Sequence, residues 1–187
     1  MPSSDDNLTT SISDTTKQGY AMVKSWLSQK QRAQICQEAL GSDYANPEKY
    51  PDKQLGFPES EDKVPKSVEL SKVARTLEAQ VQANGFPDWQ VTSINFRWYR
   101  NVGDHTHTDQ AALKYLLAVL NLHGSSQIDI FTSLDKKECK TITVDPGDLV
   151  LFRESGLGAG NLPHRVHAPT GDGLRLIALL AYVPGGF

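Results

Sequence analysis

The sequence feature that most restricts the fold is a succession of short apolar segments after Gly85, divided by turns that contain glycine or proline. In the first of them, residues 91–99, apolar and polar side chains alternate, as in a strand with one buried face. About eight such strands in succession are typical of two packed antiparallel sheets, as in a jelly roll. We predict strands at residues 91–99, 115–122, 128–132, 140–144 and 149–152, around Val166, and at 174–183.

The first half of the chain has helical periodicity instead. Apolar residues recur three or four positions apart within residues 20–40 and again between Val68 and Val81, where an Asn-Gly pair supplies a stop signal. These segments are predicted to be helices. Residues 42–66 contain four prolines, so we expect a long loop there, of the kind that can cover a site.

These patterns predict an α+β fold in a single domain that spans residues 1–187. Residues 1–13 are rich in Ser, Thr, Asp and Asn and are expected to be disordered. Residues 14–89 are expected to form a helical N-terminal part that packs on the core. Residues 90–187 are expected to form the catalytic core, a double-stranded β-helix or jelly roll. A chain of 187 residues buries enough surface to fold without a structural metal, so a metal site in it is free to be functional.

Charge and hydropathy weigh against two kinds of partner. The net charge is −3, and the sequence has no basic stripe that could follow a phosphate backbone, so we expect no nucleic acid partner. Residues 1–19 lack the apolar stretch of a secretory signal, and no apolar run is long enough to span a bilayer. We therefore expect a cytoplasmic protein with no membrane partner.

All five histidines follow residue 104, and two of them lie in the sequence Asp-His-Thr-His-Thr-Asp. In an extended chain, side chains at alternate positions share a face, so His107 and Asp109 can chelate one metal ion. The third ligand must come from elsewhere in the chain, and His164 is the candidate. The sequence leaves open two alternatives, His105 in place of His107 and His167 in place of His164.

Two imidazoles and one carboxylate on one side of a metal ion leave positions open for a chelating co-substrate and O₂. This arrangement is the facial triad of non-haem Fe(II) oxygenases. The third ligand His164 follows His107 by 57 residues, and Arg175 follows His164 by eleven. Together with the His-Thr-Asp triplet, this order of motifs resembles the Fe(II)/2-oxoglutarate-dependent dioxygenase superfamily.

Two further segments carry the resemblance, which covers residues 90–187. Residues 99–103, Tyr-Arg-Asn-Val-Gly, are similar to the stretch that leads to the first motif of the superfamily. Residues 146–152, Pro-Gly-Asp-Leu-Val-Leu-Phe, are similar to the strand that precedes its distal histidine. Residues 1–89 resemble no family that we can name.

The resemblance implies that Fe(II) and 2-oxoglutarate are the cofactors, with His107, Asp109 and His164 as the metal ligands. Arg175 stands in an otherwise apolar strand and is expected to pair with the distal carboxylate of 2-oxoglutarate. Tyr99 and Arg97 are expected on the site-facing side of the first strand, where they would bind the same ligand. The family often has Arg-x-Ser where this chain has Arg-Leu-Ile, so that hydroxyl is missing.

The expected reaction is hydroxylation of an unactivated C–H bond with O₂. Asp109 favours this outcome, because related halogenases lack the carboxylate and leave room for a halide. The expected substrate is a small metabolite or an amino acid, with a peptidyl side chain as the second choice. Residues 42–66 and 156–163 are the expected substrate-recognition segments.

Three other functions fit part of the pattern. A cupin-type metal enzyme that does not use 2-oxoglutarate would have the same ligands but no use for Arg175. A metallo-β-lactamase-type hydrolase has a His-x-His-x-Asp motif, but its motif continues differently after Asp109 and lies earlier among its strands. A non-catalytic jelly-roll binding module would have no reason to hold iron. Arg175 would then be a structural ion-pair residue and Tyr99 a core tyrosine.

Overall fold

The computed structural model describes residues 4–40, 54–58, 67–109, 113–132, 138–154 and 161–184. Within these ranges no helix combines the length and the hydropathy that a membrane span requires. The helices are α1 (Ser4–Gln18), α2 (Gln29–Leu40) and α3 (Val68–Ala83). The strands are β1 (Tyr20–Val23), β2 (Gln54–Pro58), β3 (Ser93–Arg100), β4 (Leu116–His123), β5 (Ser126–Phe131), β6 (Cys139–Val144), β7 (Leu149–Arg153), β8 (His164–Val166) and β9 (Leu174–Ala181).

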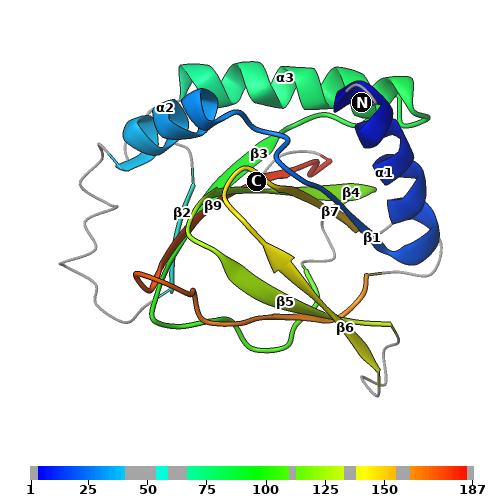
Figure 1. Cartoon of the computed structure of the whole chain (residues 1–187). Coiled ribbons are helices and arrows are strands. Elements are labelled where there is room, and N and C mark those ends of the chain that lie inside the picture. Colours follow the sequence, from blue (N-terminus) through cyan, green and yellow to red (C-terminus); the bar gives the residue numbers. More distant parts are fainter. Residues whose placement is uncertain are drawn as a thin grey trace.

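The strands form two antiparallel sheets, which confirms the predicted mixture of helices and antiparallel strands. The larger sheet has the order β1-β7-β4-β9-β3-β2, and the smaller has the order β6-β5-β8. The larger sheet lies between the helices and the smaller sheet, with α2 and α3 across its outer face (Figure 1).

The larger sheet is buried on both faces, and strand β4 contributes side chains to the hydrophobic core on each side. Leu116 and Leu120 point toward the helices and join a core that includes residues of α1, α2 and α3. Leu117 and Val119 point the other way and pack against residues of the smaller sheet. Because both faces of β4 are buried, the strand is apolar along nearly its whole length instead of alternating. The second core, between the two sheets, is where the polar residues of the site lie.

Most of the predicted elements are confirmed. The seven strands β3 to β9 follow Gly85, and each begins and ends within two residues of its predicted position. Helix α3 begins after Ser67, whose hydroxyl accepts from the backbone amide of Leu70, and ends at Ala83, with Asn84 as its C-cap. The next residue, Gly85, has φ +102°, the left-handed conformation that suits a residue just after a helix.

The N-terminal segment differs from the prediction in two places. Residues 1–13 were expected to be disordered, but α1 begins at Ser4, and Leu8 and Ile12 are fully buried on one face of it. Two apolar residues four positions apart suffice to anchor a helix once the sheet lies beside it. A helix was expected around residues 20–27, but residues 20–23 form β1, because pairing with β7 overrides the local periodicity.

The predicted loop at residues 42–66 contains strand β2, which pairs with β3 at the edge of the larger sheet. The rest of that segment, and residues 156–160 of the other predicted recognition segment, lie outside the described residues.

Candidate metal centre

Backbone pairing brings two of the predicted ligands together. His107 pairs with His164 of β8 through two hydrogen bonds, from His107 N to His164 O (2.9 Å) and from His164 N to His107 O (2.8 Å). The two imidazole rings consequently lie side by side, with centroids 4.4 Å apart. A residue 57 positions away in sequence is thus held next to His107 by the sheet itself.

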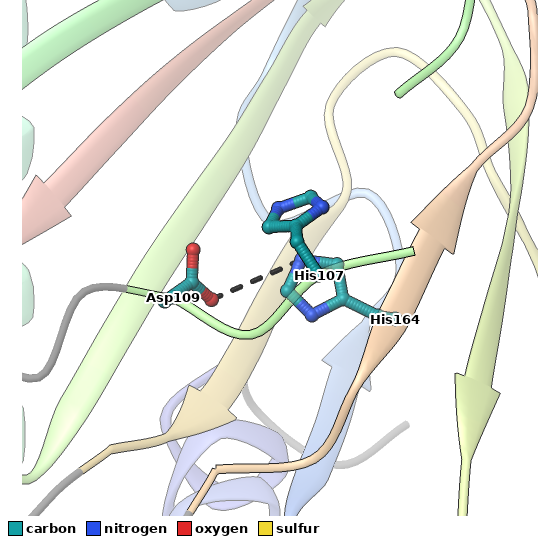
Figure 2. Close-up of side chains that lie close together, drawn as sticks. All are labelled: His107, Asp109 and His164. Carbon is teal, nitrogen blue, oxygen red and sulfur yellow. Dashed lines mark ion pairs between the residues drawn. The ribbon is translucent and has the colours of Figure 1, made fainter. Parts of the chain in front are cut away.

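Asp109 completes the cluster two residues after His107, on the same face of the extended segment. Its Oδ2 lies 3.8 Å from Nε2 of His164 (Figure 2). One nitrogen from each imidazole and one carboxylate oxygen all lie within 4.8 Å of one another. Two imidazoles and one carboxylate are the donor set of a facial triad, so these three residues fit a divalent transition metal.

The surroundings of both rings favour metal binding. Nδ1 of His107 lies 2.7 Å from the carbonyl oxygen of His105, so the ring donates there and presents Nε2 to the cluster. Burial lowers the pKa of His164, which keeps that ring neutral with a lone pair available.

A cavity lies between the two sheets and contains the three candidate ligands in its wall. Its other polar residues are Arg97, Tyr99 and Arg175, and the remainder of the wall is apolar. The predicted metal ligands and the predicted cofactor-binding residues therefore line one cavity.

Arg175 is the most unusual residue in this wall. It is 0% exposed, and its Nε donates to Oδ1 of Asn121 over 3.0 Å. Its two terminal nitrogens are buried and have no hydrogen-bond partner among the described residues. Burial lowers the pKa of Arg175 to about 10, so the side chain still carries its charge at neutral pH. A buried cation with two unused donor groups is costly on its own and has the chemistry to bind an anion.

The sequence matches no protein-family model and no curated protein. Solved structures do match. A prolyl-4-hydroxylase from Pseudomonas putida is 17% identical and has a TM-score of 0.66, over 94% of this chain and 98% of its own. The 2-oxoglutarate-dependent carbocyclase SnoK of nogalamycin biosynthesis is 16% identical, with a TM-score of 0.67 over 98% and 87% of the two chains. HygX from Streptomyces hygroscopicus, solved with nickel and 2-oxoglutarate, is 12% identical, with a TM-score of 0.62 over 95% and 87%.

The chain has the fold of the 2-oxoglutarate/Fe(II) oxygenases. The similarity extends over almost the whole chain, including the N-terminal part for which the sequence showed no resemblance. The fold that the resemblance of residues 90–187 implied is thus the fold that these solved structures share.

Tyr99 and Arg97 occupy the side of β3 that faces the cavity, as predicted. Tyr99 is 2% exposed, and the guanidinium carbon of Arg175 lies 5.6 Å from the centre of its ring. Burial raises the pKa of Tyr99, so its hydroxyl keeps its proton. Arg97 lies 3.5 Å from Asp104, in an ion pair that uses one end of its guanidinium.

The alternative histidines do not join the cluster. The side chain of His105 is 87% exposed and pairs with Asp104. Its ring lies 5.6 Å from the ring of His107, and its backbone carbonyl accepts from Nδ1 of His107. His167 lies 2.9 Å from Asp129 of the smaller sheet. His123, expected at the surface, is partly exposed and stacks on Trp98.

Sequence reasoning missed two polar residues near the site. Asn121 holds Arg175, and the signal for it was a single amide within the apolar run of β4. Glu154 follows β7 and is 0% exposed, and its Oε2 accepts from the amide of Asn161. Burial and the neighbouring Asp109 raise the pKa of Glu154 to about 9, so it carries a proton at neutral pH. Its position became visible only when the fold placed the end of β7 beside Asp109.

Proposed function

We propose that this protein is a non-haem Fe(II)/2-oxoglutarate-dependent oxygenase. The observation that carries the proposal is the combination of Arg175 with the His107, Asp109 and His164 cluster in one cavity. A cupin-type enzyme without 2-oxoglutarate would share the cluster, but it would gain nothing from a buried guanidinium with two unused donors. We also infer that the two sheets form a double-stranded β-helix and that the chain is a single domain.

In this proposal, three residues bind the metal ion and a fourth binds the co-substrate. His107, Asp109 and His164 would hold Fe(II), and Arg175 would bind the distal carboxylate of 2-oxoglutarate in a bidentate manner. Tyr99 and Arg97 would complete the polar wall of that cavity. When iron and 2-oxoglutarate are bound, they supply an oxidant derived from O₂ that hydroxylates a C–H bond. The balance is substrate R–H, 2-oxoglutarate and O₂ giving R–OH, succinate and CO₂.

The apolar wall has its own role. Phe152 stacks on the ring of His164 with centroids 4.7 Å apart, and Ile177 and Val119 line the cavity beside it. These side chains exclude water from the region around Arg175, which strengthens its attraction for a carboxylate. They would also protect a reactive oxidant from side reactions, as the protein does in cofactor-dependent enzymes generally.

Anaerobic spectroscopy tests the proposal before any substrate is known. Fe(II) and 2-oxoglutarate added together to the protein are expected to produce a visible charge-transfer band that neither produces alone. Admission of O₂ should then release succinate, slowly without substrate. Absence of both the band and the succinate would contradict the proposal, and O₂ consumption independent of 2-oxoglutarate would favour the cupin alternative.

A further inference from the structure

A second cavity lies next to the first on the inner face of the larger sheet. The described residues around it come from β3, β4, β9 and the segment before β4. Four residues belong to both cavities and form the partition between them: Arg97, Asp109, Leu117 and Leu179. A molecule in the second cavity would therefore lie directly beside the carboxylate of the candidate metal ligand Asp109.

One wall of the second cavity is polar and belongs to a single strand. Ser93, Asn95 and Arg97 occupy alternate positions of β3 and so project from the same face. Oδ1 of Asn95 is buried and has no hydrogen-bond partner among the described residues. A buried acceptor without a partner is costly, which points to a ligand that donates a hydrogen bond at this position.

Arg97, two residues further along β3, offers hydrogen-bond donors and a positive charge where Asn95 offers an acceptor. Alternate residues of a strand are about 7 Å apart, so Arg97 and Asn95 can hold the two ends of one small polar group. Arg97 contacts Asp104 through one terminal nitrogen at 3.5 Å and also interacts with the hydroxyl of Tyr99, and a guanidinium has five N–H groups in all. Arg97 therefore has donors left for an anion in the second cavity.

The rest of the lining is aliphatic. On the same sheet face, Leu179 and Ala181 of β9 lie beside Asn95 and Ser93, and Leu117 of β4 lies beside Ala181. Leu113 completes this wall from the segment before β4; Leu117 is 3% exposed and Ala181 4% exposed. This wall offers no hydrogen bond, so it suits a saturated side chain. It continues to the partition at Leu117 and Leu179, where the two cavities meet.

We propose that the second cavity is the substrate site and that it binds a free aliphatic α-amino acid. The inference rests on the proposed function and specifies its substrate class. The carboxylate would pair with Arg97, the ammonium group would donate to Oδ1 of Asn95, and the aliphatic chain would follow Leu117 toward Asp109. A residue within a peptide would supply a donor for Asn95 but no carboxylate for Arg97.

Calorimetric titration under anaerobic conditions, with Fe(II) and 2-oxoglutarate present, tests this directly. The probes are L-leucine, L-isoleucine and L-norleucine. Three analogues of leucine each lack part of the recognised group: isopentylamine, 4-methylpentanoate and N-acetyl-L-leucinamide. At least one amino acid is expected to bind, and at least tenfold more tightly than any of the three analogues. Equal binding of the capped amide would overturn the proposal in favour of a peptidyl substrate.

Two variants with reciprocal effects separate this inference from the proposed function. Asn95→Ala is expected to weaken amino-acid binding at least tenfold and to leave 2-oxoglutarate binding within about twofold of wild type. Arg175→Met is expected to weaken 2-oxoglutarate binding and to leave amino-acid binding close to wild type. For this variant, amino-acid binding is measured on the Fe(II) protein without 2-oxoglutarate. Circular dichroism checks that both variants are folded.

Each failure has a distinct signature. If 2-oxoglutarate binds and none of the amino acids does, the substrate class is wrong while the proposed function stands. If the amino acids bind and 2-oxoglutarate does not, the proposed function is wrong. If Asn95→Ala leaves amino-acid affinity unchanged, the second cavity is not where they bind.

Discussion

Oδ1 of Asn121 accepts a hydrogen bond of 3.0 Å from Nε of Arg175, between the neighbouring strands β4 and β9. The side-chain nitrogen Nδ2 of Asn121 donates in turn to the carbonyl oxygen of Gly124 over 2.7 Å, which fixes the orientation of Oδ1. Because Asn121 engages Nε, the two terminal nitrogens of Arg175 remain free to face the cavity. Asn121 is thus a positioning residue for the guanidinium.

Replacement of this amide tests that role. Asn121→Leu keeps the size of the side chain and removes the acceptor. We expect the dissociation constant of 2-oxoglutarate to rise about 10- to 100-fold, the range for a hydrogen bond to a charged group. At saturating 2-oxoglutarate the turnover number should stay close to wild type, so the effect appears in KM and not in kcat. A purely structural role would lower the melting temperature without this split.

Arg175→Met should raise the dissociation constant of 2-oxoglutarate about 30- to 1,000-fold, because it removes a charge-assisted bidentate pair. Arg175→Lys should restore only part of the affinity, since a point charge does not reproduce the planar fork. Iron binding should persist in both variants. Thermal unfolding is a useful second measurement: removal of a buried cation whose two terminal nitrogens have no partner among the described residues should leave the melting temperature unchanged or higher. If Arg175→Met bound 2-oxoglutarate with unaltered affinity, a residue other than Arg175 would have to bind its distal carboxylate.

Each of the substitutions His107→Ala, Asp109→Ala and His164→Ala should abolish Fe(II) binding in calorimetric titration, since a facial triad has no ligand to spare. His105→Ala is the matched control, because its side chain is exposed and is not part of the three-residue cluster, and the substitution keeps the backbone carbonyl that accepts from His107. It should bind Fe(II) about as well as wild type. Loss of binding in His105→Ala with retention in His107→Ala would reverse the assignment.

Asp129 of β5 gives a prediction about stability at acid pH. The hydroxyl of Thr141, Arg165 and His167 all bind its carboxylate and lower its pKa to about 2. A folded pKa below the unfolded value of about 3.9 means that the stabilisation is complete above that value and disappears as the pH falls toward 2. Asp129→Asn should therefore lower the free energy of unfolding by about 1–2 kcal/mol at pH 7. Urea titrations should show the difference from wild type narrowing below about pH 4, and a difference independent of pH would contradict the assignment.

The sequence predicted what depends on local pattern. The strands after Gly85 were visible from their apolar runs and turns, and His107, Asp109 and His164 from their spacing. The strand at Tyr20–Val23 was not visible, because only its pairing with β7 makes it a strand. The second cavity was not visible either, since Asn95 and Leu113 meet only after the chain has folded.

Strands β1 and β2, which come from the N-terminal part of the chain, determine whether residues 90–187 can stand alone. β1 and β2 are the outermost strands of the larger sheet, so β7 and β3 both have a hydrogen-bonded neighbour on each side. A fragment of residues 90–187 would keep every candidate site residue and yet present two bare strand edges, which invite association with other chains. Residue 90 is therefore a change of sequence pattern and not a domain boundary. A chimaera that joined residues 90–187 to another protein would carry the candidate site residues but would lack β1 and β2, which cover the edges of the larger sheet.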